Sequence, residues 1–587
     1  QTLSGIISGT GSVVKSGTSQ LILTGTNTYS GATTISAGAL TIGSSEAIPS
    51  GSDVTVNGIL NLNGFDLTVS SLAGSGEVVN YGGYDLFSGA NTSLANGLIL
   101  YLDPGNPLSY AGSGTSWSDL SSSNSDVTIA GSPNYDSSTG TFNFIDGKYA
   151  YVSSNQSNFD DLSSGFSVFS IYNFGGANSW ERIIDFGSGE YNANVLLSRW
   201  GTTSDLALQV YNTPTASDIV ASGAISDGWA SYAATIDGSD VGTLYKDGSS
   251  LASGTVTTPS NADRNNLYIG ESNWSADSQD TNMRLMLIYN RALTADEINT
   301  LHTATASRSA ATLTINNSSA MTFGGSIDDN LSILNLTKIN TGALTLSGSS
   351  NYSGVTTISA GSIYATHGSA LGNYGSGQGT TVSDGAMLKI SGGVTVAEPI
   401  TINGSGISSN GAIYFESGNN TYSGAITLGS NSIITSDAGN QTISGTIDGA
   451  NSLSINDAGG HWYHRGVIGG TTALTTLTID GGIIDLYDPV TTSGAINILA
   501  SDYIYIEDDI TITGASQNLY LKAVDEINQL GASTIQTNGG SVVFWANSDG
   551  DAEEWDLIRT GTINTNGGHV WLGGSYLNTG SFTWNGL

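Results

Sequence analysis

Short runs of alternating apolar and polar residues fill both ends of the chain. The runs QLILTG, ATTISAG, DVTVNG and ILNLNG place apolar residues at alternate positions before Gly, Asn or Ser interrupts them. Alternation with a period of two is typical of β-strands, and the interrupting residues favour turns. Runs such as TLTINNSSAMTFGGSI and TLTIDGGIIDLYDPV show the same pattern from residue 309 onward. Residues 1–94 and 306–587 are therefore predicted to consist of many short strands.

The spacing of these strands favours a solenoid over hairpins. Hairpins usually turn through two residues such as Asn-Gly, whereas most turns here are longer and the pattern repeats at roughly twenty residues. Such a repeat predicts coils of a right-handed parallel β-helix, stacked about 4.8 Å apart. At this spacing the N-terminal region supplies about four or five coils and the C-terminal region about fourteen.

One stretch recurs almost unchanged. NTYSGATTISAGAL at Asn27–Leu40 returns as NYSGVTTISAGSI at Asn351–Ile363 and in part as NTYSGAI at Asn420–Ile426. Each copy holds a tyrosine two residues before a glycine, namely Tyr29, Tyr352 and Tyr422. We interpret the tyrosines as turn-packing residues of the scaffold, with stacking on a glycan as the alternative.

The pattern changes between residues 95 and 305. Aromatic residues become frequent, the predicted strands lengthen, and LTADEINTLH at Leu293–His302 has the pattern of a short helix. Thr294 and Glu297 have the spacing of a capping box. This region is predicted to form a separate β-sandwich with one helix, so that the chain as a whole is all-β.

Composition excludes several classes of function. The 587 residues include 49 Asp and Glu but only 14 Lys and Arg, which gives a net charge of −35. Phosphate backbones and anionic membrane surfaces are repelled by such a chain. The absence of cysteine rules out disulfides and thiolate metal sites. No run of 18 apolar residues is present, so no membrane-spanning helix is expected, and the opening at Gln1 without a leader suggests a cleaved signal peptide or a fragment.

Two resemblances concern the solenoid regions. LILTGTNTYSGATTISAGALTIG and GALTLSGSSNYSGVTTISAGSI resemble the autotransporter-associated β-strand repeat. SVVFWANSDGDAEEWDLIRTGTINTNGGHVWLGG at Ser541–Gly574 resembles repeats of filamentous-haemagglutinin-like proteins. Both families imply a right-handed β-helix on a secreted or surface protein of bacteria.

The middle region resembles the laminin-G-like, concanavalin-A-like jelly roll. The matching pieces follow the family's order, from GLILYLDPGNPL and GTFNFIDGKYAYV through FSVFSIYNF and NLYIGE to MRLMLIYNRALTADEINTLH. In that family the strand before the helix returns beside the first strand, so the domain can be inserted into a loop. We therefore expect a β-helix interrupted by a jelly roll, although two separate rods flanking a bead also fit the repeats.

Candidate calcium ligands occur in two loops. The related pentraxins bind calcium through carboxylates after the strand that corresponds to NLYIG, which implies Glu271, Asn273, Asp277 and Asp280 here. Trp274 in the same loop is a candidate for stacking on a sugar. A second acidic loop alternates oxygen donors at Asn547, Asp549 and Asp551, a spacing seen in calcium loops. Calcium is the only cofactor that these loops suggest.

Other clusters give weaker indications of chemistry. In HWYHR, His461 and His464 would face opposite sides of a strand, so that a shared metal would require a loop. The carboxylate run of jelly-roll glycanases is missing, because Glu554-Trp555-Asp556 is followed by Arg559 where the last glutamate should stand. No nucleophile, zinc or phosphate-loop motif is found. We expect a protein that is not an enzyme.

The sequence therefore predicts a secreted or surface-displayed bacterial adhesin. Its β-helix would be a rod, and its jelly roll would bind a cell-surface glycan or protein ligand. The alternative is a structural subunit that assembles with copies of itself into a filament or sheath through β-helix ends and jelly-roll contacts. Neither nucleic acid nor a membrane span in this chain is part of either hypothesis.

Overall fold

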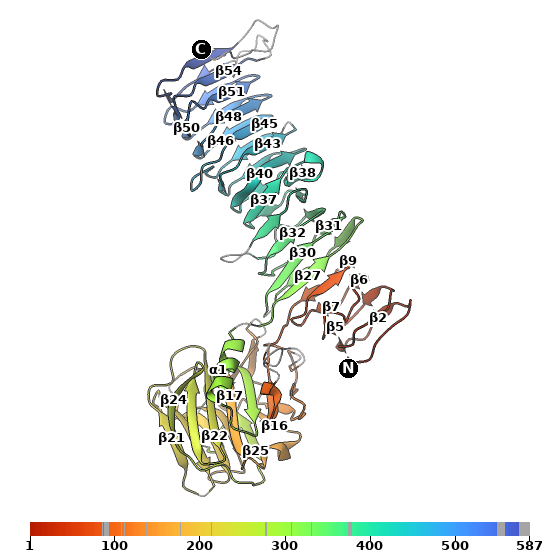
Figure 1. Ribbon diagram of the computed structural model, residues 1–587, viewed down its shortest axis with the longest axis vertical. Helices are drawn as coiled ribbons and strands as arrows, with labels where there is room; N and C mark the ends of the chain where they lie inside the picture. The colour runs from red at the N-terminus through yellow and green to blue at the C-terminus, as the bar shows by residue number, and fades with distance from the viewer. Residues whose placement is uncertain are drawn as a thin grey trace. The chain divides into compact units, whose positions relative to one another are not determined.

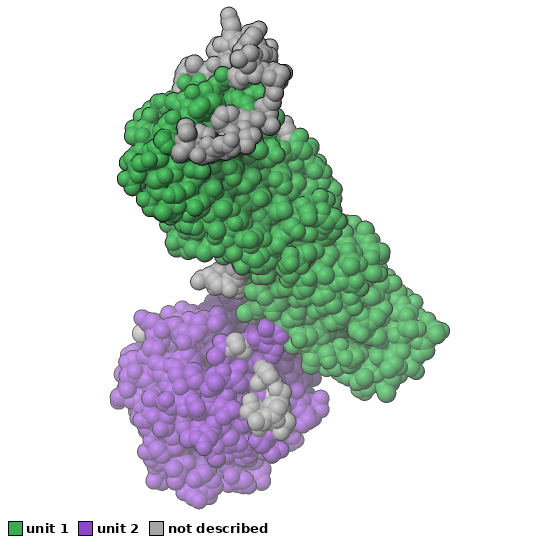
Figure 2. Space-filling model, turned by 45° about the horizontal axis from the view of Figure 1, so that its top comes forward, with its two compact units in different colours: residues 1–80, 311–329, 333–587 green, residues 81–310, 330–332 purple. Residues whose placement is uncertain are grey.

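The chain forms two compact units (Figure 2). The computed structural model describes residues 1–84, 86, 93–106, 109–110, 112–136, 139–176, 178–212, 214–275, 277, 279–306, 308–329, 332–373, 379–458, 460–548 and 558–574. Unit 1 comprises residues 1–80, 311–329 and 333–587, and unit 2 comprises residues 81–310 and 330–332.

Unit 1 is a solenoid of parallel strands, seen in Figure 1 as a stack of coils. Partner strands lie one coil apart in the sequence. Ile59, for example, pairs with Glu77, and Val542 pairs with Val570. The number of residues per coil therefore varies, as expected when the strands are fixed and the turns differ in length.

Parallel ladders of strands make up the described part of this solenoid. The N-terminal coils contain two of them: β1 (Thr2–Leu3), β3 (Leu21–Leu23), β5 (Ala39–Ile42), β7 (Ile59–Asn61), β10 (Glu77–Val79) and β29 (Ser326–Asp328) in one, and β2 (Val13–Lys15), β4 (Thr33–Ile35), β6 (Asp53–Val56) and β9 (Ser71–Ala73) in the other.

Two longer ladders share the strand β40 (Ile426–Ser436). The first contains β8 (Leu67–Val69), β27 (Ala311–Ile315), β30 (Leu334–Lys338), β32 (Thr356–Ile358), β34 (Thr380–Val382), β37 (Ile400–Gly404) and β42 (Ile447–Asp448). The second contains β28 (Met321–Phe323), β31 (Ala343–Leu346), β33 (Ser362–Ala365), β35 (Met387–Ser391), β38 (Ile413–Ser417), β43 (Leu453–Asp457), β45 (Leu477–Gly481), β48 (Ile496–Ala500), β51 (Leu519–Ala523), β54 (Val542–Ala546) and β57 (Val570–Gly574).

Two further ladders belong to the C-terminal coils. One contains β36 (Thr395–Val396), β39 (Thr421–Tyr422), β41 (Gln441–Ile443), β44 (His461–His464), β46 (Ile483–Leu486), β49 (Ile504–Ile506), β52 (Ile527–Gln529) and β55 (Ile558–Arg559). The other contains β47 (Val490–Thr492), β50 (Ile510–Ala515), β53 (Thr534–Asn538) and β56 (Thr562–Asn564).

The solenoid continues across the point where the chain leaves it. The last coil before unit 2 contains β8, β9 and β10, and the first coil after it contains β27, β28 and β29. Leu67 pairs with Leu313, Gly74 with Phe323, and Val78 with Ile327. One coil therefore stacks on the other strand by strand. The prediction of an all-β chain whose solenoid is interrupted by an inserted jelly roll is confirmed.

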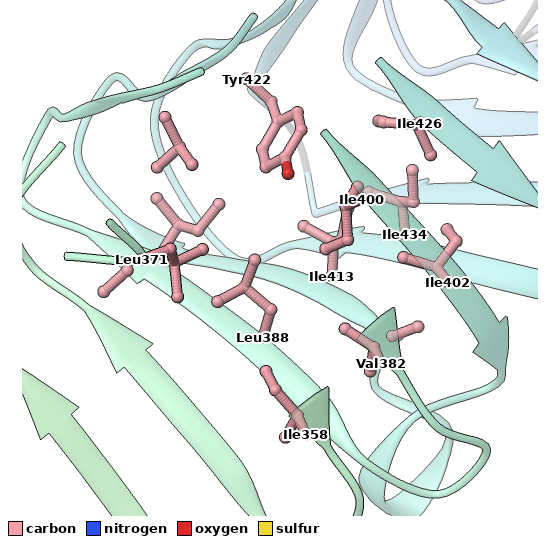
Figure 3. Packing of buried hydrophobic residues seen from close by; sticks show 14 of the residues in the cluster. Ile358, Leu371, Val382, Leu388, Ile400, Ile402, Ile413, Tyr422, Ile426 and Ile434 are labelled. Atoms are coloured by element: carbon pink, nitrogen blue, oxygen red, sulfur yellow. The ribbon is translucent and has the colours of Figure 1, made fainter. Parts of the chain in front are cut away.

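Alternate residues of each strand point into the solenoid. In β27, Ala311, Leu313 and Ile315 are buried, whereas Thr312 and Thr314 are partly exposed. Figure 3 shows Leu388, Ile400, Ile413 and Ile434 converging on the interior from successive coils. The period of two in the sequence thus corresponds to one apolar face turned inward.

The recurring tyrosines lie in this interior. Tyr29 and Tyr352 are almost fully buried, and their hydroxyls bond the hydroxyls of Thr33 (2.7 Å) and Thr356 (2.6 Å), four residues on in each copy. Tyr422 has no threonine at that position and donates instead to the backbone oxygen of Glu398 at 2.6 Å. The tyrosines are therefore scaffold residues, as the sequence indicated, and not available for glycan stacking.

A lysine accompanies the complete copies and connects adjacent coils. Lys338 is fully buried, and its ammonium donates to the backbone oxygens of Ile339 and Asn340 (both 2.7 Å) and of Ala360 in the next coil (3.3 Å). Lys15 donates to the oxygens of Gly17 and, at 3.0 Å, Ala37 in the same way. The turn carbonyls have no partner in a strand ladder, and each ammonium bonds such carbonyls from two neighbouring coils.

The histidines of HWYHR lie on opposite sides of β44, as predicted for a strand. His461 is half-buried and outward, whereas His464 is fully buried in the solenoid core. Burial lowers the pKa of His464 to about 4, so its ring is neutral at physiological pH. The two rings therefore cannot share one metal ion.

Unit 2 consists of two antiparallel sheets with a hydrophobic core between them. The first contains β14 (Asn134–Asp136), β15 (Thr141–Ile145), β26 (Asp280–Tyr289), β17 (Gly165–Phe174), β22 (Ala230–Asp237), β23 (Val241–Lys246) and β24 (Ser249–Thr255), with β11 (Leu98–Leu102) on β26. The second contains β12 (Ser116–Trp117), β13 (Val127–Ala130), β16 (Tyr149–Val152), β25 (Asn266–Ile269), β18 (Arg182–Gly187), β19 (Asn194–Arg199), β20 (Leu206–Tyr211) and β21 (Ser217–Ala221).

The helix α1 (Ala295–Ala304) follows β26, and Thr294 and Glu297 form the predicted capping box. Its residues Ile298 and Leu301 pack with Phe169 and Leu287 on the outer face of the first sheet. As the resemblance implied, β26 returns beside β11, with Leu100 opposite Ile288. The segments Gln156–Phe159 and Ile407–Ser409 form short 3-10 helices. No helix in the described part of the chain is long and apolar enough to span a bilayer.

Replacing Lys338 by Met should destabilise the solenoid by about 2 kcal/mol, because charge-assisted hydrogen bonds to three backbone carbonyls are lost. Urea denaturation followed by circular dichroism measures this. Thr337→Val changes the partly exposed neighbour on the same strand and should alter the free energy of unfolding by less than about 0.5 kcal/mol. Equal effects of the two substitutions would show that the ammonium does not hold the coils together.

Glu398 should make the solenoid less stable as the pH rises. Its side chain is 4% exposed, and burial raises its pKa to about 7. Because the folded-state pKa exceeds the unfolded value of about 4.3, the stabilisation is complete below pH 4 and is lost as the pH rises through 7, by up to about 3 kcal/mol. Glu398→Gln should remove this loss. Parallel pH profiles of the two proteins between pH 5 and 8 would contradict the assignment.

Candidate functional site

Two strands of the second jelly-roll sheet place polar side chains on its outer face. In β20, Leu206, Leu208 and Val210 belong to the core, so that Gln209 and Tyr211 point the other way. The next strand but one, β18, contributes Arg182 to the same face. Both Gln209 and Arg182 are nevertheless buried, at 4% and 3% exposure, because neighbouring loops pack over this part of the sheet.

These loops and strands enclose a pocket of about 180 Å³. Its walls are rich in aromatic rings and hold a few polar groups, the composition expected of a ligand site. Whole small-molecule sites usually measure about 300–1,000 Å³, so this pocket fits one ring-sized group of a larger ligand. It is lined by Trp180, Arg182, Tyr191, Gln209, Tyr211, Trp274 and Asp277.

Three aromatic rings form one side of the pocket. The ring of Trp274 lies 5.2 Å from that of Tyr191, nearly perpendicular to it, and 5.5 Å from that of Tyr211. Tyr191 is 48% exposed, so the group of rings reaches the surface. Trp180 packs against Trp200 at 5.1 Å. Rings held by such contacts present rigid apolar surface at little entropic cost.

Arg182 and Asp277 form a fixed ion pair at the pocket. Nη2 of Arg182 donates to Oδ2 of Asp277 at 2.7 Å, and the same oxygen accepts a 2.6 Å bond from the hydroxyl of Ser272. The guanidinium carbon lies 5.6 Å from the rings of both Trp180 and Trp274. The ion pair and the ring contacts together fix the loop that carries Trp274 onto β18.

Gln209 and Arg182 provide the free hydrogen-bonding capacity of the pocket. The amide of Gln209 lines the cavity, and no hydrogen bond joins it to another described residue. Nε and Nη1 of Arg182, which lines the same cavity, are buried and have no hydrogen-bond partner among the described residues. Because the amide carries both donors and an acceptor, it can bind a hydroxyl, a carbonyl or an amide group of a ligand.

The four predicted calcium ligands after β25 serve mainly to hold their own loop. Asn273 bonds Asp185 through its backbone and side-chain nitrogens (both 2.8 Å), Asp277 pairs with Arg182, and Glu271 accepts from the backbone of Ser272 at 2.9 Å. Asp280 accepts a long bond of 3.4 Å from Asn143. Across the described residues, no three His, Cys, Asp or Glu side chains are grouped as a metal site.

The electrostatic setting of this rim nevertheless suits a cation. Burial raises the pKa of Glu271, and the carboxylates of Asp146, Asp185 and Asp277 raise it further. A bound cation would relieve this repulsion. Calcium at Glu271, Asn273, Asp277 and Asp280 thus stays a prediction. The same holds for the second loop, where Asn547 is described but Asp549 and Asp551 lie outside the described residues.

Sequence reasoning identified only part of the pocket. Trp274 was predicted as a ligand-stacking residue and Asp277 as a metal ligand, and both line the cavity. Arg182 and Gln209 were missed. Their signal in the sequence is a single polar residue inside an otherwise apolar strand, as in LALQVY, which indicates a side chain with a specific partner.

Residues 146–299 match the family model of the concanavalin A-like lectin/glucanases superfamily. Every residue that lines the pocket falls within this range. The passenger-associated-transport-repeat matches residues 13–42 and 336–363, which contain the two complete copies of the recurring stretch. Both matches confirm the corresponding sequence resemblances.

A curated relative shares a short part of the chain. The adhesin BmaC autotransporter of Brucella suis biovar 1 (strain 1330) is 41% identical over 99 residues, which are 16% of this chain. The match spans only 3% of the length of that protein.

Solved structures show weak likeness. They include the binding domain of botulinum neurotoxin DC in complex with rat synaptotagmin II (16% identity, TM-score 0.30) and the binding domain of Paraclostridial mosquitocidal protein 1 (16% identity, TM-score 0.28). Each match covers 36% of this chain and 52% of the other chain. Scores of this size carry no argument about the function of this chain.

Replacing Arg182 by Met should destabilise the jelly roll by about 3–5 kcal/mol, because Asp277 and Asp185 are left as buried, uncompensated charges. Calorimetry of the full chain measures the loss. Lys148→Met removes a cation from the same domain without breaking an ion pair, and it should shift the transition little. A loss below about 1 kcal/mol for Arg182→Met would show that the ion pair does not fix the loop.

Proposed function

We propose that this chain is part of a bacterial cell-surface adhesin whose jelly roll binds a glycan or protein ligand of another surface. The observation that carries the proposal is the pocket on the second sheet, where Gln209 offers an unpaired amide between aromatic rings. The solenoid serves as the rod on which the jelly roll is displayed. Binding, and not turnover, is the activity that this arrangement favours.

The energetics of the pocket support binding. The rings of Trp274, Tyr191 and Tyr211 expose apolar surface that gains from contact with the apolar part of a ligand. The amide of Gln209 faces the cavity and can bond a polar group of a ligand that enters it. A ligand with an apolar face and a hydroxyl or carbonyl group at its edge satisfies both requirements.

The same pocket is poorly suited to glycoside hydrolysis. Such hydrolysis normally requires two carboxyl groups that flank the scissile bond. Asp277 is the only carboxylate among the residues that line the cavity, and it is paired with Arg182. This supports a binding role for a domain whose superfamily includes both lectins and glucanases.

The comparisons support the cellular setting. The curated relative is an autotransporter adhesin, and the solenoid contains passenger-associated repeats. A secreted or surface-displayed chain agrees with both. The net charge of −35 fits this setting as well, because calcium ions and salt outside the cell screen it.

The test is a glycan array together with a panel of host-surface proteins, probed with the full chain in the presence of calcium and of a chelator. Trp274→Ala and Gln209→Ala should each weaken binding about tenfold or more, because each removes a main contact of the ligand. Tyr151→Ala serves as the matched control, since Tyr151 lies on the same sheet but outside the pocket.

Binding that both pocket variants retain in full would contradict the assignment of this site. Absence of any bound glycan or protein would contradict the adhesin function itself. A loss of binding in the chelator alone would support the predicted calcium site after β25, whereas equal binding in both conditions would overturn it.

A further inference from the structure

A strip of aromatic and charged residues covers three successive coils of the solenoid. It lies on the outward side of the ladder that contains β44, β46 and β49. Their inward residues, such as Trp462, Ile484 and Ile504, are fully buried in the core. We call it the Tyr463 strip and define it by His461, Tyr463, Arg465, Asp485, Tyr487 and Tyr503.

The strip is built in register. Tyr463 pairs with Asp485, and Asp485 pairs with Tyr505, so aromatic, acidic and aromatic side chains follow one another along the coil axis. The ring of His461 stacks on that of Tyr463 with centroids 3.8 Å apart, and Tyr463 stacks on Tyr487 at 6.5 Å. The rings of His461, Tyr463, Tyr487 and Tyr503 are all half-buried, so each keeps part of its surface in solvent.

Polar groups lie between the rings. Oδ2 of Asp485 is 2.8 Å from Nε2 of His461 and accepts from the hydroxyl of Tyr487 at 3.2 Å. Its other oxygen, Oδ1, has no hydrogen-bond partner among the described residues. The guanidinium of Arg465 lies 3.9 Å from the ring centroid of Tyr487, yet this exposed side chain makes no ion pair or hydrogen bond with any described residue.

The guanidinium of Arg465 keeps its donors free for a ligand. It is held by its contact with the ring of Tyr487, and it is exposed and forms no ion pair among the described residues. Such an arrangement is pre-organised to donate hydrogen bonds to a ligand.

A second aromatic ladder shows what a structural cluster looks like in the same solenoid. On β33, β35 and β38, Lys389 lies between Tyr364 and Tyr414, 4.3 Å and 5.0 Å from their ring centroids. Its ammonium donates to the hydroxyl of Tyr364 at 2.7 Å and contacts Glu416 at 3.2 Å. The polar groups of that ladder bond one another, so it serves to stabilise the sheet.

We propose that the Tyr463 strip is a second binding site, which holds a polysaccharide chain along the rod. A pyranose ring has an apolar C–H face that packs on tyrosine and histidine rings, and its hydroxyl edge can bond Arg465 and the tyrosine hydroxyls, while the buried Asp485 holds the rings of His461 and Tyr487 in place. Tyr463 and Tyr505 lie two rungs of the ladder apart, a distance of about 10 Å. This length suits a short run of sugar units.

The dimensions and charge of the strip favour this ligand over others. Thr442 and Asn528, the outward residues on the flanking rungs of the same ladder, are not aromatic, so the strip is narrow. A standard protein interface buries about 800 Å² per partner around an apolar centre, so a narrow strip suits a folded protein partner poorly. A net charge of −35 disfavours nucleic acid.

The test is a microarray of neutral and uronate-containing polysaccharides, probed with the full chain. The array also carries a hexasaccharide of each polysaccharide, so that binding along a chain is distinguished from binding to the ends of a chain. Tyr463→Ala and Tyr503→Ala should each weaken binding to the retained glycan about tenfold. Tyr503→Phe keeps the stacking ring and should bind within about threefold of the parent chain.

Two control variants separate the possible causes of a loss. Tyr364→Ala truncates a tyrosine of the saturated ladder, so it should leave glycan binding unchanged although it removes the same number of atoms. Gln209→Ala reports on the jelly-roll pocket separately: a glycan held by the strip loses affinity with Tyr463→Ala, whereas a glycan held by the pocket loses affinity with Gln209→Ala. Circular dichroism confirms that the variants are folded. Failure of the proposed pocket and failure of the strip are therefore distinguishable.

Three results would overturn the proposal. The first is that the parent chain retains no polysaccharide of the array. The second is that Tyr463→Ala and Tyr503→Ala bind as tightly as the parent. The third is that a protein from the host-surface panel, and no glycan, depends on Tyr463, which would assign the strip to a protein partner instead.

Discussion

The backbone hydrogen bonds between neighbouring coils are the interaction on which the solenoid depends. A single coil has unpaired N–H and C=O groups on both sides and an interior too small to be a core, so each coil is stable only between two others. An insertion between coils threatens this arrangement. Here β8, β9 and β10 pair directly with β27, β28 and β29, so the ladders continue where the chain departs and returns. Within the inserted unit, the first strand β11 lies beside β26 near the end of the domain. A domain whose entry and exit strands are neighbours can be accommodated without separating the coils on either side.

Buried polar groups fix which coil stacks on which. Apolar residues alone would allow neighbouring coils to slide, because isoleucine, leucine and valine occupy equivalent inward positions throughout. Lys338 binds carbonyls of its own turn and of the turn 22 residues on, at Ala360. A shifted register would leave both the ammonium and the carbonyls buried without partners, which costs several kcal/mol. Lys15 binds the backbone oxygen of Ala37, 22 residues on, in the same way.

The sequence was sufficient for those parts of the fold that depend on local pattern. Alternation predicted the strands, the repeat length predicted coils, and Thr294 with Glu297 predicted the start of α1. The candidate pocket was predicted only through Trp274 and Asp277, which share one polar loop. Gln209 and Arg182 come from β20 and β18, and the order of strands in the sheet brings them to the same loop. No local pattern contains that order. Asp277 also shows what residue type alone does not reveal: its carboxylate is paired with Arg182, a partner 95 residues away.

Scaffold residues and candidate binding residues differ in one respect in this molecule. The polar atoms of a scaffold residue are hydrogen-bonded within the fold, and those of a candidate binding residue are not. Tyr352, Lys338 and the Tyr364–Lys389–Tyr414 ladder have their hydroxyl and ammonium groups bonded within the chain, so their role is complete in the absence of any ligand. Gln209 and Arg465 differ, because the fold positions them beside aromatic rings and leaves their donors unpaired among the described residues. An unpaired polar group adds nothing to folding, so stability alone does not account for the placement of either side chain. A ligand that supplies the missing partner would account for both. By this criterion Gln209 and Arg465 mark the proposed binding surfaces of the jelly roll and of the solenoid.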